Sequence, residues 1–355
     1  MASFRYFFRV FLFTAGPKWL GVAPLGIGQL LAPMLLQAVG WLLWLAAAHL
    51  DMRLAVAALA VALSGLTWMT HLFWRLVRRS QLDDRVHALT VGWACLAGCL
   101  SLAGLAISLA LGAPAVALAC VLSGLWGFVL VVYMAVAHRM IPFFTTSALP
   151  LMQAWRPFWV LWLMLGVATV EVASVWVELN GPPAGAAASL WPLLRGGVEL
   201  AAGGMLCWIA LTWGLVKSLN NRLLAMLHIG FVWLGLALLL GGAAQWLGWL
   251  QGAPVLSLGA LHALTMGCLA SLMLAMVTRV SCGHSGRPLV ADGIAWMLFW
   301  LLQLATALRI AAAAQSPFSA RLVLAAALLW AAVMAVWGVR LGSWYGRLRA
   351  DGRTG

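Results

Sequence analysis

Seven histidines are the residues of this chain best suited to chemistry: His49, His71, His87, His138, His228, His262 and His284. They stand in a sequence that is 65% hydrophobic and only 8% charged. Imidazole nitrogens ligate haem iron, copper and zinc, and an ionisable side chain inside a membrane is costly and usually functional. The histidines therefore indicate a metal or cofactor site within an apolar protein.

The spacing of the histidines limits how they can share a metal. His262 and His284 are 22 residues apart, about 33 Å along a helix, and so mark opposite ends of one span. His262 and Met266 share one helical face and form a pair suited to copper, and His228 is a further metal candidate. Two axial ligands of one haem must come from different helices. For His49 the simpler interpretation is a hydrogen-bonding group at a helix end.

Cysteines and carboxylates add weaker candidates. The six cysteines contain no C-x-x-C motif and are best interpreted as small packing residues, although Cys95 and Cys99 share a face that suits soft copper. Glu171 is predicted to lie deep in a span and is a candidate for a proton path. Arg195 and Glu199 have the spacing of a helical salt bridge.

The elements that position these residues are membrane-spanning helices. An ordinary soluble domain carries about 25% charged residues, far more than this chain does. A span needs about 20 mostly apolar residues. The stretches that qualify are 27–50, 53–77, 86–111, 114–141, 156–180, 196–217, 223–249, 256–280, 291–314 and 318–343. The sequence therefore predicts an all-α, polytopic transmembrane bundle, and none of its connections is long enough for a soluble domain.

The basic residues predict the orientation of this bundle. The net charge is +13, and the ten spans place 17 of the 21 basic residues on one side. The other four are Arg53, Arg195, Arg309 and Arg321. This asymmetry predicts that both termini are cytoplasmic and makes nucleic-acid binding an unnecessary explanation of the charge. Residues 4–15, with Arg5 and Arg9 one turn apart, are predicted to form an interfacial helix.

An internal repeat divides the chain into two halves. HALTVG begins at His87 and HALTMG begins at His262, 175 residues later. The two hexapeptides fall on the third and eighth spans, which run in opposite directions. The pattern predicts one membrane domain built from an inverted five-plus-five repeat, 1–180 and 181–355, with a site where the halves meet. A miscounted span would make the repeat parallel instead.

Several longer segments resemble one family. Residues 261–289 read LHALTMGCLASLMLAMVTRVSCGHSGRPL, which closely resembles the C-terminal signature of the NnrS family. HRMIPFFTTSAL (138–149) is similar to the family's R-x-x-P-x-F-T segment, and LLAMLHIGFVWLGLALL (223–239) to its L-H-x-G-y-x-W helix. A weaker likeness to R-P-F-F begins at Arg5. Together these segments cover about a quarter of the chain.

The resemblance implies a haem- and copper-containing protein of the bacterial inner membrane that is associated with the nitric oxide response. It implies haem b and copper as cofactors and His228, His262 and His284 as the family-type histidines. Arg279 and Arg287 either hold haem propionates or only follow the positive-inside pattern. The family's N-terminal H-E-M and N-W-T-G motifs are missing, so either His71 or His87 substitutes or a cofactor is missing. The family usually has nearer twelve spans, which makes this chain a shortened member.

Two other functions remain open from the sequence. The repeat and Glu171 also suit a transporter of haem, a metal or a small solute, and a non-catalytic assembly or sensor protein is a third class. The expected partners are the lipid bilayer, nitric oxide or another small ligand, and an electron donor such as a quinol. The residues do not decide whether a bound ligand is turned over.

Overall fold

The computed structural model describes residues 12–149, 155–181, 186–256, 258–314, 316–345 and 347–352, without the side chains of 186–189. Within these ranges the chain is helical and contains no strand. Ten described helices are long and apolar enough to cross a membrane, which confirms the predicted all-α bundle of ten spans. The protein is thus a multi-pass membrane protein.

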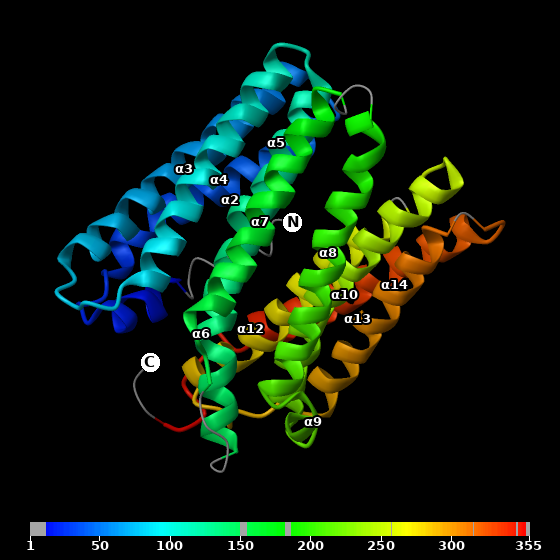
Figure 1. The fold of residues 1–355 in the computed structure, drawn as a ribbon. Coiled ribbons are helices and arrows are strands. Elements are labelled where there is room, and N and C mark those ends of the chain that lie inside the picture. The colour runs from blue at the N-terminus through cyan, green and yellow to red at the C-terminus, as the bar shows by residue number, and fades with distance from the viewer. Residues whose placement is uncertain are drawn as a thin grey trace. The chain divides into compact units, whose positions relative to one another are not determined.

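The spans follow one another along the chain with short connections (Figure 1). They are α2 (Ile27–Ala47), α3 (Met52–Arg79), α4 (Val86–Ala110), α5 (Pro114–Gly124) with the π-helix η1 (Leu125–Leu130) and α6 (Val131–Ala148), α7 (Phe158–Leu179), α8 (Ala186–Thr212), α10 (Arg222–Gln251), α11 (Gly259–His262) with the π-helix η2 (Ala263–Leu269) and α12 (Ala270–His284), α13 (Gly293–Ala312) and α14 (Ser319–Gly342). A short helix, α9 (Leu215–Ser218), precedes α10.

Polar N-cap residues fix where three of these helices begin. The side chain of Asp51 accepts the backbone N–H of Arg53 at 2.7 Å, at the start of α3. Asn221 caps α10 and Asp292 caps α13 in the same way. Each cap satisfies a backbone donor that has no partner within its own helix.

Two predicted span boundaries are wrong. The fourth span continues to Ala148 instead of ending at 141, because Pro142 is accommodated inside α6. The hydroxyl of Thr146 donates to the carbonyl of Pro142 within this helix. The sixth span was expected at 196–217 but covers Leu190–Thr212, because Gly214 adopts a left-handed conformation with φ of 96°.

The predicted interfacial helix at 4–15 is only partly described. Residues 4–11, including Arg5 and Arg9, lie outside the described residues. Residues 12–20 are helical, and Leu12, Phe13 and Leu20 in this helix are buried. Leu12 and Phe13 pack in one apolar cluster with Phe73 of α3 and Val91 of α4.

The chain divides into two compact units, which we treat separately. Unit 1 comprises Met1–Arg139 and Pro157–Pro182, and unit 2 comprises Met140–Arg156 and Pro183–Gly355. The second half of α6 thus belongs to unit 2 although it lies in the first half of the sequence. The inverted relation between the sequence halves stays a prediction.

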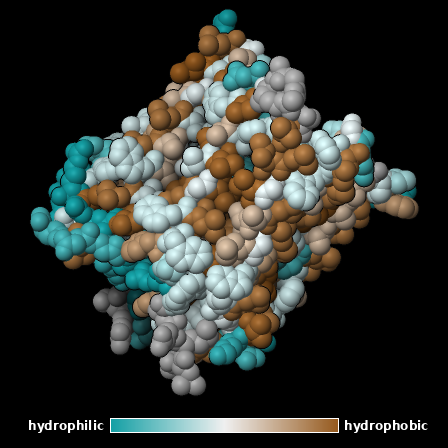
Figure 2. Space-filling view, viewed as in Figure 1, coloured by the Kyte–Doolittle hydropathy of each residue, from teal (hydrophilic) through white to brown (hydrophobic). Residues whose placement is uncertain are grey.

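The surface agrees with a membrane environment. Large apolar side chains are exposed on many helices, among them Leu42, Leu100, Trp300 and Leu328. Figure 2 shows apolar residues over much of the visible face, and hydrophilic residues gathered at the connection between α3 and α4. That connection carries the exposed residues Arg78, Arg79, Asp83 and Asp84. Apolar exposure on this scale is compatible with lipid but not with water.

Within unit 2, α10 runs antiparallel to the span formed by α11, η2 and α12. A Cβ at Gly230 of α10 would lie 3.1 Å from Leu272 of α12, and one at Gly241 would lie 3.7 Å from Ala260 of α11. Between these points, a Cβ at Gly267 would lie 2.5 Å from the ring of Trp233. Glycine therefore lets η2 approach the indole closely. These contacts determine where His228 and His262 lie along the two antiparallel spans.

Candidate histidine sites

The histidines divide into a buried and an exposed set. His87, His138 and His228 have exposed fractions of 2%, 1% and 0%, respectively. His262 is half-buried, whereas His49, His71 and His284 are exposed. A buried imidazole nitrogen is costly without a partner, so the buried set and His262 are the stronger ligand candidates.

In unit 1, His87 and His138 contact each other. Nε2 of His87 lies 2.9 Å from Nδ1 of His138, which joins α4 to α6. Nε2 of His138 lies 3.1 Å from the carbonyl oxygen of Pro157, immediately before α7. The ring of Phe158 lies against both imidazoles, with centroid distances of 5.8 and 6.2 Å. Three helices of unit 1 thus meet at one pair of histidines.

The carbonyl of Pro157 determines the proton positions in this pair. A carbonyl oxygen only accepts hydrogen bonds, so Nε2 of His138 must carry a hydrogen and donate it. In the neutral imidazole the lone pair is then on Nδ1, which faces His87. Nε2–H of His87 donates to this lone pair. The tertiary structure therefore presents His138 Nδ1 as a fixed acceptor.

Three of the segments that carry the family resemblance meet in unit 2. Thr145 of α6 comes from the R-x-x-P-x-F-T segment, and its Oγ1 lies 3.0 Å from Nε2 of His228 in α10. The neighbouring residue, Phe144, lies under the guanidinium of Arg279 in α12, 3.9 Å from ring centroid to Cζ. Residues from positions 144, 145, 228 and 279 thus form one cluster of contacts.

His228 has one ring nitrogen with no hydrogen-bond partner. The hydroxyl of Thr145 donates to the carbonyl of Ile141 at 2.8 Å, so it accepts from Nε2–H of His228. Nδ1 of His228 then carries a lone pair that is buried and unpaired. Leaving a buried acceptor unpaired costs about 1–3 kcal/mol, which a bound ligand, metal or water would recover.

His262 also has an unpaired ring nitrogen, and it lies next to an irregular helix. Its Nε2 is buried and has no hydrogen-bond partner. The π-helix η2 begins at the next residue, and π-helical turns are frequent at functional sites. Arg309 of α13 is close enough for its charge to act on His262. An imidazole and a cation are therefore available near the same end of unit 2.

An apolar groove runs between α10 and α13 beside this end. Its volume is about 470 Å³, and it is lined by Trp233, Leu236, Leu239, Leu240, Ala307, Ile310 and Ala311. The indole N–H of Trp233 donates to Oε1 of Gln303 at 2.6 Å, so it leaves no unpaired donor in the groove. Ile310 follows Arg309 in sequence and packs against α11, where a Cβ at Gly259 would lie 3.8 Å from it. The helix of His262 thus adjoins the groove.

His228 and His262 lie too far apart to ligate one metal ion. Gly230 packs against Leu272, so His228 is level with this part of α12. Leu272 follows His262 by ten residues, which corresponds to roughly 15 Å of helix. Metal–nitrogen bonds are only about 2 Å long. The two unpaired nitrogens therefore belong to two separate positions.

The remaining candidates of the family signature contact the C-terminal segment. The backbone carbonyl of His284 accepts from Nη1 of Arg349 at 3.4 Å, and the backbone N–H of Ala350 donates to Ser285. The guanidinium of Arg287 lies 4.5 Å from the ring centroid of Trp344. The structure thus places His284 and Arg287 at the junction with the chain end, and does not bring them to His228 or His262.

Each unit also buries one glutamate. Glu171 of α7, the predicted proton-path residue, has an exposed fraction of 2% in unit 1. Glu199 of α8, at 3%, forms a salt bridge of 2.8 Å with Arg195 in unit 2, as the spacing predicts. A role for Glu171 in proton transfer stays a prediction.

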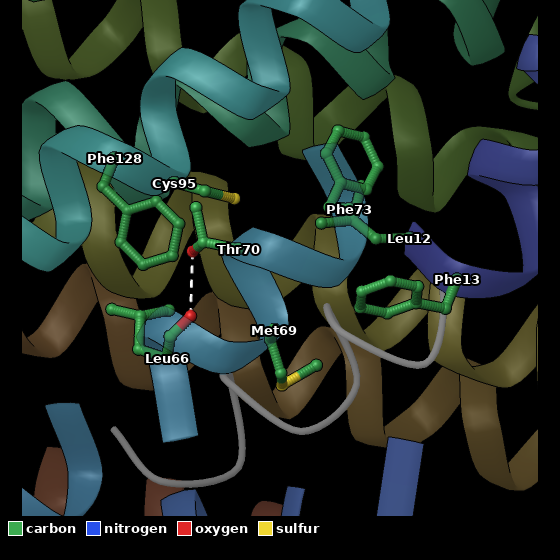
Figure 3. A pocket seen from close by; sticks show the side chains of 8 residues that line it. All are labelled: Leu12, Phe13, Leu66, Met69, Thr70, Phe73, Cys95 and Phe128. Carbon is green, nitrogen blue, oxygen red and sulfur yellow. Dashed lines mark hydrogen bonds between the residues drawn. The ribbon is translucent and has the colours of Figure 1, made fainter. Parts of the chain in front are cut away.

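A cavity of about 20 Å³ in unit 1 is too small for a cofactor. Leu12, Phe13, Met69, Phe73, Cys95 and Phe128 line it together with Leu66 and Thr70. Figure 3 shows Thr70 donating its hydroxyl hydrogen to the carbonyl of Leu66, at 2.8 Å. The lining is therefore almost wholly apolar, and no histidine contributes to it.

The described residues fit haem better than a many-ligand copper centre. Small-molecule sites have volumes of roughly 300–1,000 Å³, and the groove between α10 and α13 falls within this range. His262 would supply a nitrogen for the iron, and Arg309 would supply a cation for the propionates. Among the described residues, no three His, Cys, Asp or Glu side chains converge on one point. Copper on His262 and Met266 stays a prediction, since nothing in the structure joins these two side chains.

The sequence missed two residues of these clusters. His138 was recognised as a histidine but not as a site residue, and Thr145 was not singled out. Both lie within the segment 138–149 that resembles the family, which was the available signal. Their partners, His87 and His228, are 51 and 83 residues away, so only tertiary structure could supply the pairing.

The fold defines a polytopic helical membrane protein that buries several of its histidines. Comparison with protein families agrees with this class. The chain matches the family described as NnrS protein over residues 3–349, and it belongs to that family. The family association with the nitric oxide response therefore extends to this chain. Searches of curated proteins and of solved structures find no match.

Proposed function

We propose that this protein binds haem b in unit 2 and acts in nitric oxide or nitrosative stress tolerance. The observation that carries the proposal is the buried, unpaired Nε2 of His262 beside the apolar groove of α10 and α13. In this arrangement His262 would hold the iron, Arg309 would pair with the carboxylates, and the groove side chains would exclude water from the macrocycle.

One histidine beside the groove suits a ligand-binding role. His228 lies at a separate level, so it would not hold the same iron as His262. Haem held by one histidine would supply an iron atom that binds nitric oxide. Nitric oxide is apolar and partitions into the bilayer, so it needs no gated path. The basic residues support a bacterial inner-membrane location with both termini cytoplasmic.

Absorption spectroscopy tests the proposal directly. We expect detergent-purified protein to show a Soret band in the reduced-minus-oxidised spectrum, and this band to shift when nitric oxide is added. His262→Ala is expected to lose the haem, and the exposed His49→Ala and His284→Ala to retain it. His228→Ala tests the second candidate position, because this variant should lose haem only if haem is held at His228. Folded wild-type protein without haem, or full haem in His262→Ala, would refute the assignment.

A further inference from the structure

A group of cations in unit 2 has no part in the haem proposal. These cations lie where α12 and α14 end, on the side that the basic residues predict to be cytoplasmic. We propose that this end of unit 2 binds an anionic phospholipid, with its phosphate on Arg287 and Arg347 and its acyl chains beside Leu348. The inference goes beyond the proposed function and does not depend on haem binding.

The residues after α14 form part of this surface. The hydroxyl oxygens of Tyr345 and Ser281 lie 2.8 Å apart, and the backbone N–H of Ala350 donates to the carbonyl of Ser285 at 2.9 Å. Ser281 is in the last turn of α12, and Ser285 follows the helix directly. The chain end is therefore held against the end of α12 at two points, which gives the cations on both segments defined positions.

Two of the arginines at this end already have carboxylate partners. The guanidinium of Arg340 pairs with Asp292, and that of Arg349 pairs with Asp351 at 2.7 Å. Each of these pairs carries no net charge, so neither attracts a lipid phosphate strongly.

Arg287 and Arg347 differ from these two arginines. In the described part of the chain, no Asp or Glu lies within salt-bridge distance of either one. Arg347 is exposed, whereas Arg287 is half-buried and lies over the indole of Trp344, 4.5 Å from Cζ to the ring centroid. A ring against the face of a guanidinium leaves its N–H edge free, and this edge can donate two hydrogen bonds to one phosphate. Arg287 is thus held in a position suited to a phosphate.

Exposed apolar side chains beside these cations favour a lipid over a free phosphate. Leu348, next to Arg347, is 97% exposed, and Leu289 and Val290, within three residues of Arg287, are 47% and 59% exposed. At the end of a span, such side chains reach the boundary between the headgroups and the acyl chains. Cations with apolar neighbours match both parts of a phospholipid, whereas inorganic phosphate would use only the cations.

The positive-inside pattern alone does not require this arrangement, because that pattern depends only on how many basic residues each side carries. In unit 1, Arg78 and Arg79 contribute to it as exposed side chains at the end of α3, in a connection that also carries Asp83 and Asp84. Arg287 instead is half-buried against an aromatic ring. Arg79 therefore provides a control of the same charge on the same predicted side of the membrane.

Native mass spectrometry of the full-length protein in neutral detergent tests the site. We expect phosphatidylglycerol to bind more tightly than phosphatidylcholine with the same acyl chains. Arg287→Gln should weaken phosphatidylglycerol binding about fivefold, the effect of one basic residue near an anionic headgroup. Arg347→Gln should weaken it as well, and this side chain is exposed, so the fold does not depend on it. Arg79→Gln should bind as the wild type does.

Equal binding of the two lipids by the wild type would overturn the proposal. So would unchanged phosphatidylglycerol binding in both the Arg287 and the Arg347 variants. Haem content is measured on the same samples: loss of lipid binding with full haem content separates this site from the one at His262.

Two further measurements identify the ligand. Leu348→Ser keeps every charge, and we expect it to weaken phosphatidylglycerol binding because it removes the contact with the acyl chains. Inorganic phosphate is then added as a competitor at the concentration of the lipid. We expect the lipid to remain bound, and its full displacement would assign the site to a free anion and overturn the lipid assignment.

Discussion

The two units arrange their buried histidines differently. In unit 1, His87 and His138 are hydrogen-bonded to each other, and Nε2 of His138 also donates to the carbonyl of Pro157. In unit 2, His228 and His262 lie apart, and each retains a buried nitrogen without a partner. A buried polar group is stable only when it is paired. The pair in unit 1 therefore holds its helices together without a ligand, whereas the histidines of unit 2 gain most from one.

The repeated hexapeptide shows the same contrast. Gly92 ends HALTVG in unit 1, and a Cβ there would lie 3.0 Å from the ring of Trp74. Gly267 ends HALTMG in unit 2, and a Cβ there would lie 2.5 Å from the ring of Trp233. In both units a tryptophan of the preceding span packs on the glycine, but η2 makes the approach closer in unit 2. The two similar hexapeptides thus form similar glycine–tryptophan contacts, but the contact in unit 2 leaves less room for a larger side chain.

Substitution of these two glycines is expected to give the largest effect. Gly267→Ala forces Trp233 or η2 to move, and we expect it to lower the free energy of unfolding by about 3 kcal/mol. Gly92→Ala should cost about 1 kcal/mol, because the indole of Trp74 has to move less. SDS titration in mixed micelles measures both. Equal losses would mean that the π-helix does not tighten the contact in unit 2.

Double-mutant cycles then test whether the histidines are coupled. For His87→Leu and His138→Leu we expect a coupling free energy of about 2 kcal/mol, because either single change removes the buried hydrogen bond between the two rings. For His228→Leu and His262→Leu, roughly 15 Å apart along the span, the effects should add within about 0.5 kcal/mol. Metal-free and haem-free protein is used for both cycles. Strong coupling in unit 2 would contradict the separation of its two positions.

Thr145→Val tests one hydrogen bond of unit 2, the bond between Thr145 and His228. The valine cannot accept the Nε2–H of His228, and we expect a loss of about 1 kcal/mol in the free energy of unfolding. Thr169→Val is the control, since Thr169 also donates to the carbonyl four residues earlier but is exposed. If the two variants lose the same amount, the Thr145–His228 bond contributes nothing beyond the local helix.

A surface ion pair of unit 2 provides the smallest expected effect. Its hydrogen bond to Arg340 lowers the pKa of Asp292, which lies before α13. This stabilisation is present above the ordinary pKa of an aspartate and is lost as the pH falls through the lowered value. Both side chains are partly exposed, so we expect a change below about 1 kcal/mol in the unfolding free energy. Asp292→Asn should remove this pH dependence. An unchanged acid dependence in the variant would assign it to other groups.

The sequence alone determined the membrane architecture and the family. Long apolar stretches separated by breakers correctly predicted ten spans, because a helix that crosses a bilayer must satisfy its backbone within itself. The segments at 138–149, 223–239 and 261–289 were sufficient to indicate the NnrS family. Boundaries were less predictable: Pro142 stays inside α6, and Gly214 follows the sixth span, each decided by local hydrogen bonds and backbone conformation.

Only the tertiary structure decided which histidines meet. Nothing in the spacing of His87 and His138, or of Thr145 and His228, shows that the residues of each pair touch, because helix packing brings them together across 51 and 83 residues. Burial also separated His228 from the exposed His71 and His284, which the sequence had ranked alongside it. The physical reason is that a sequence fixes the types of donor and their depth along a helix, whereas the face that each helix turns inward depends on its neighbours.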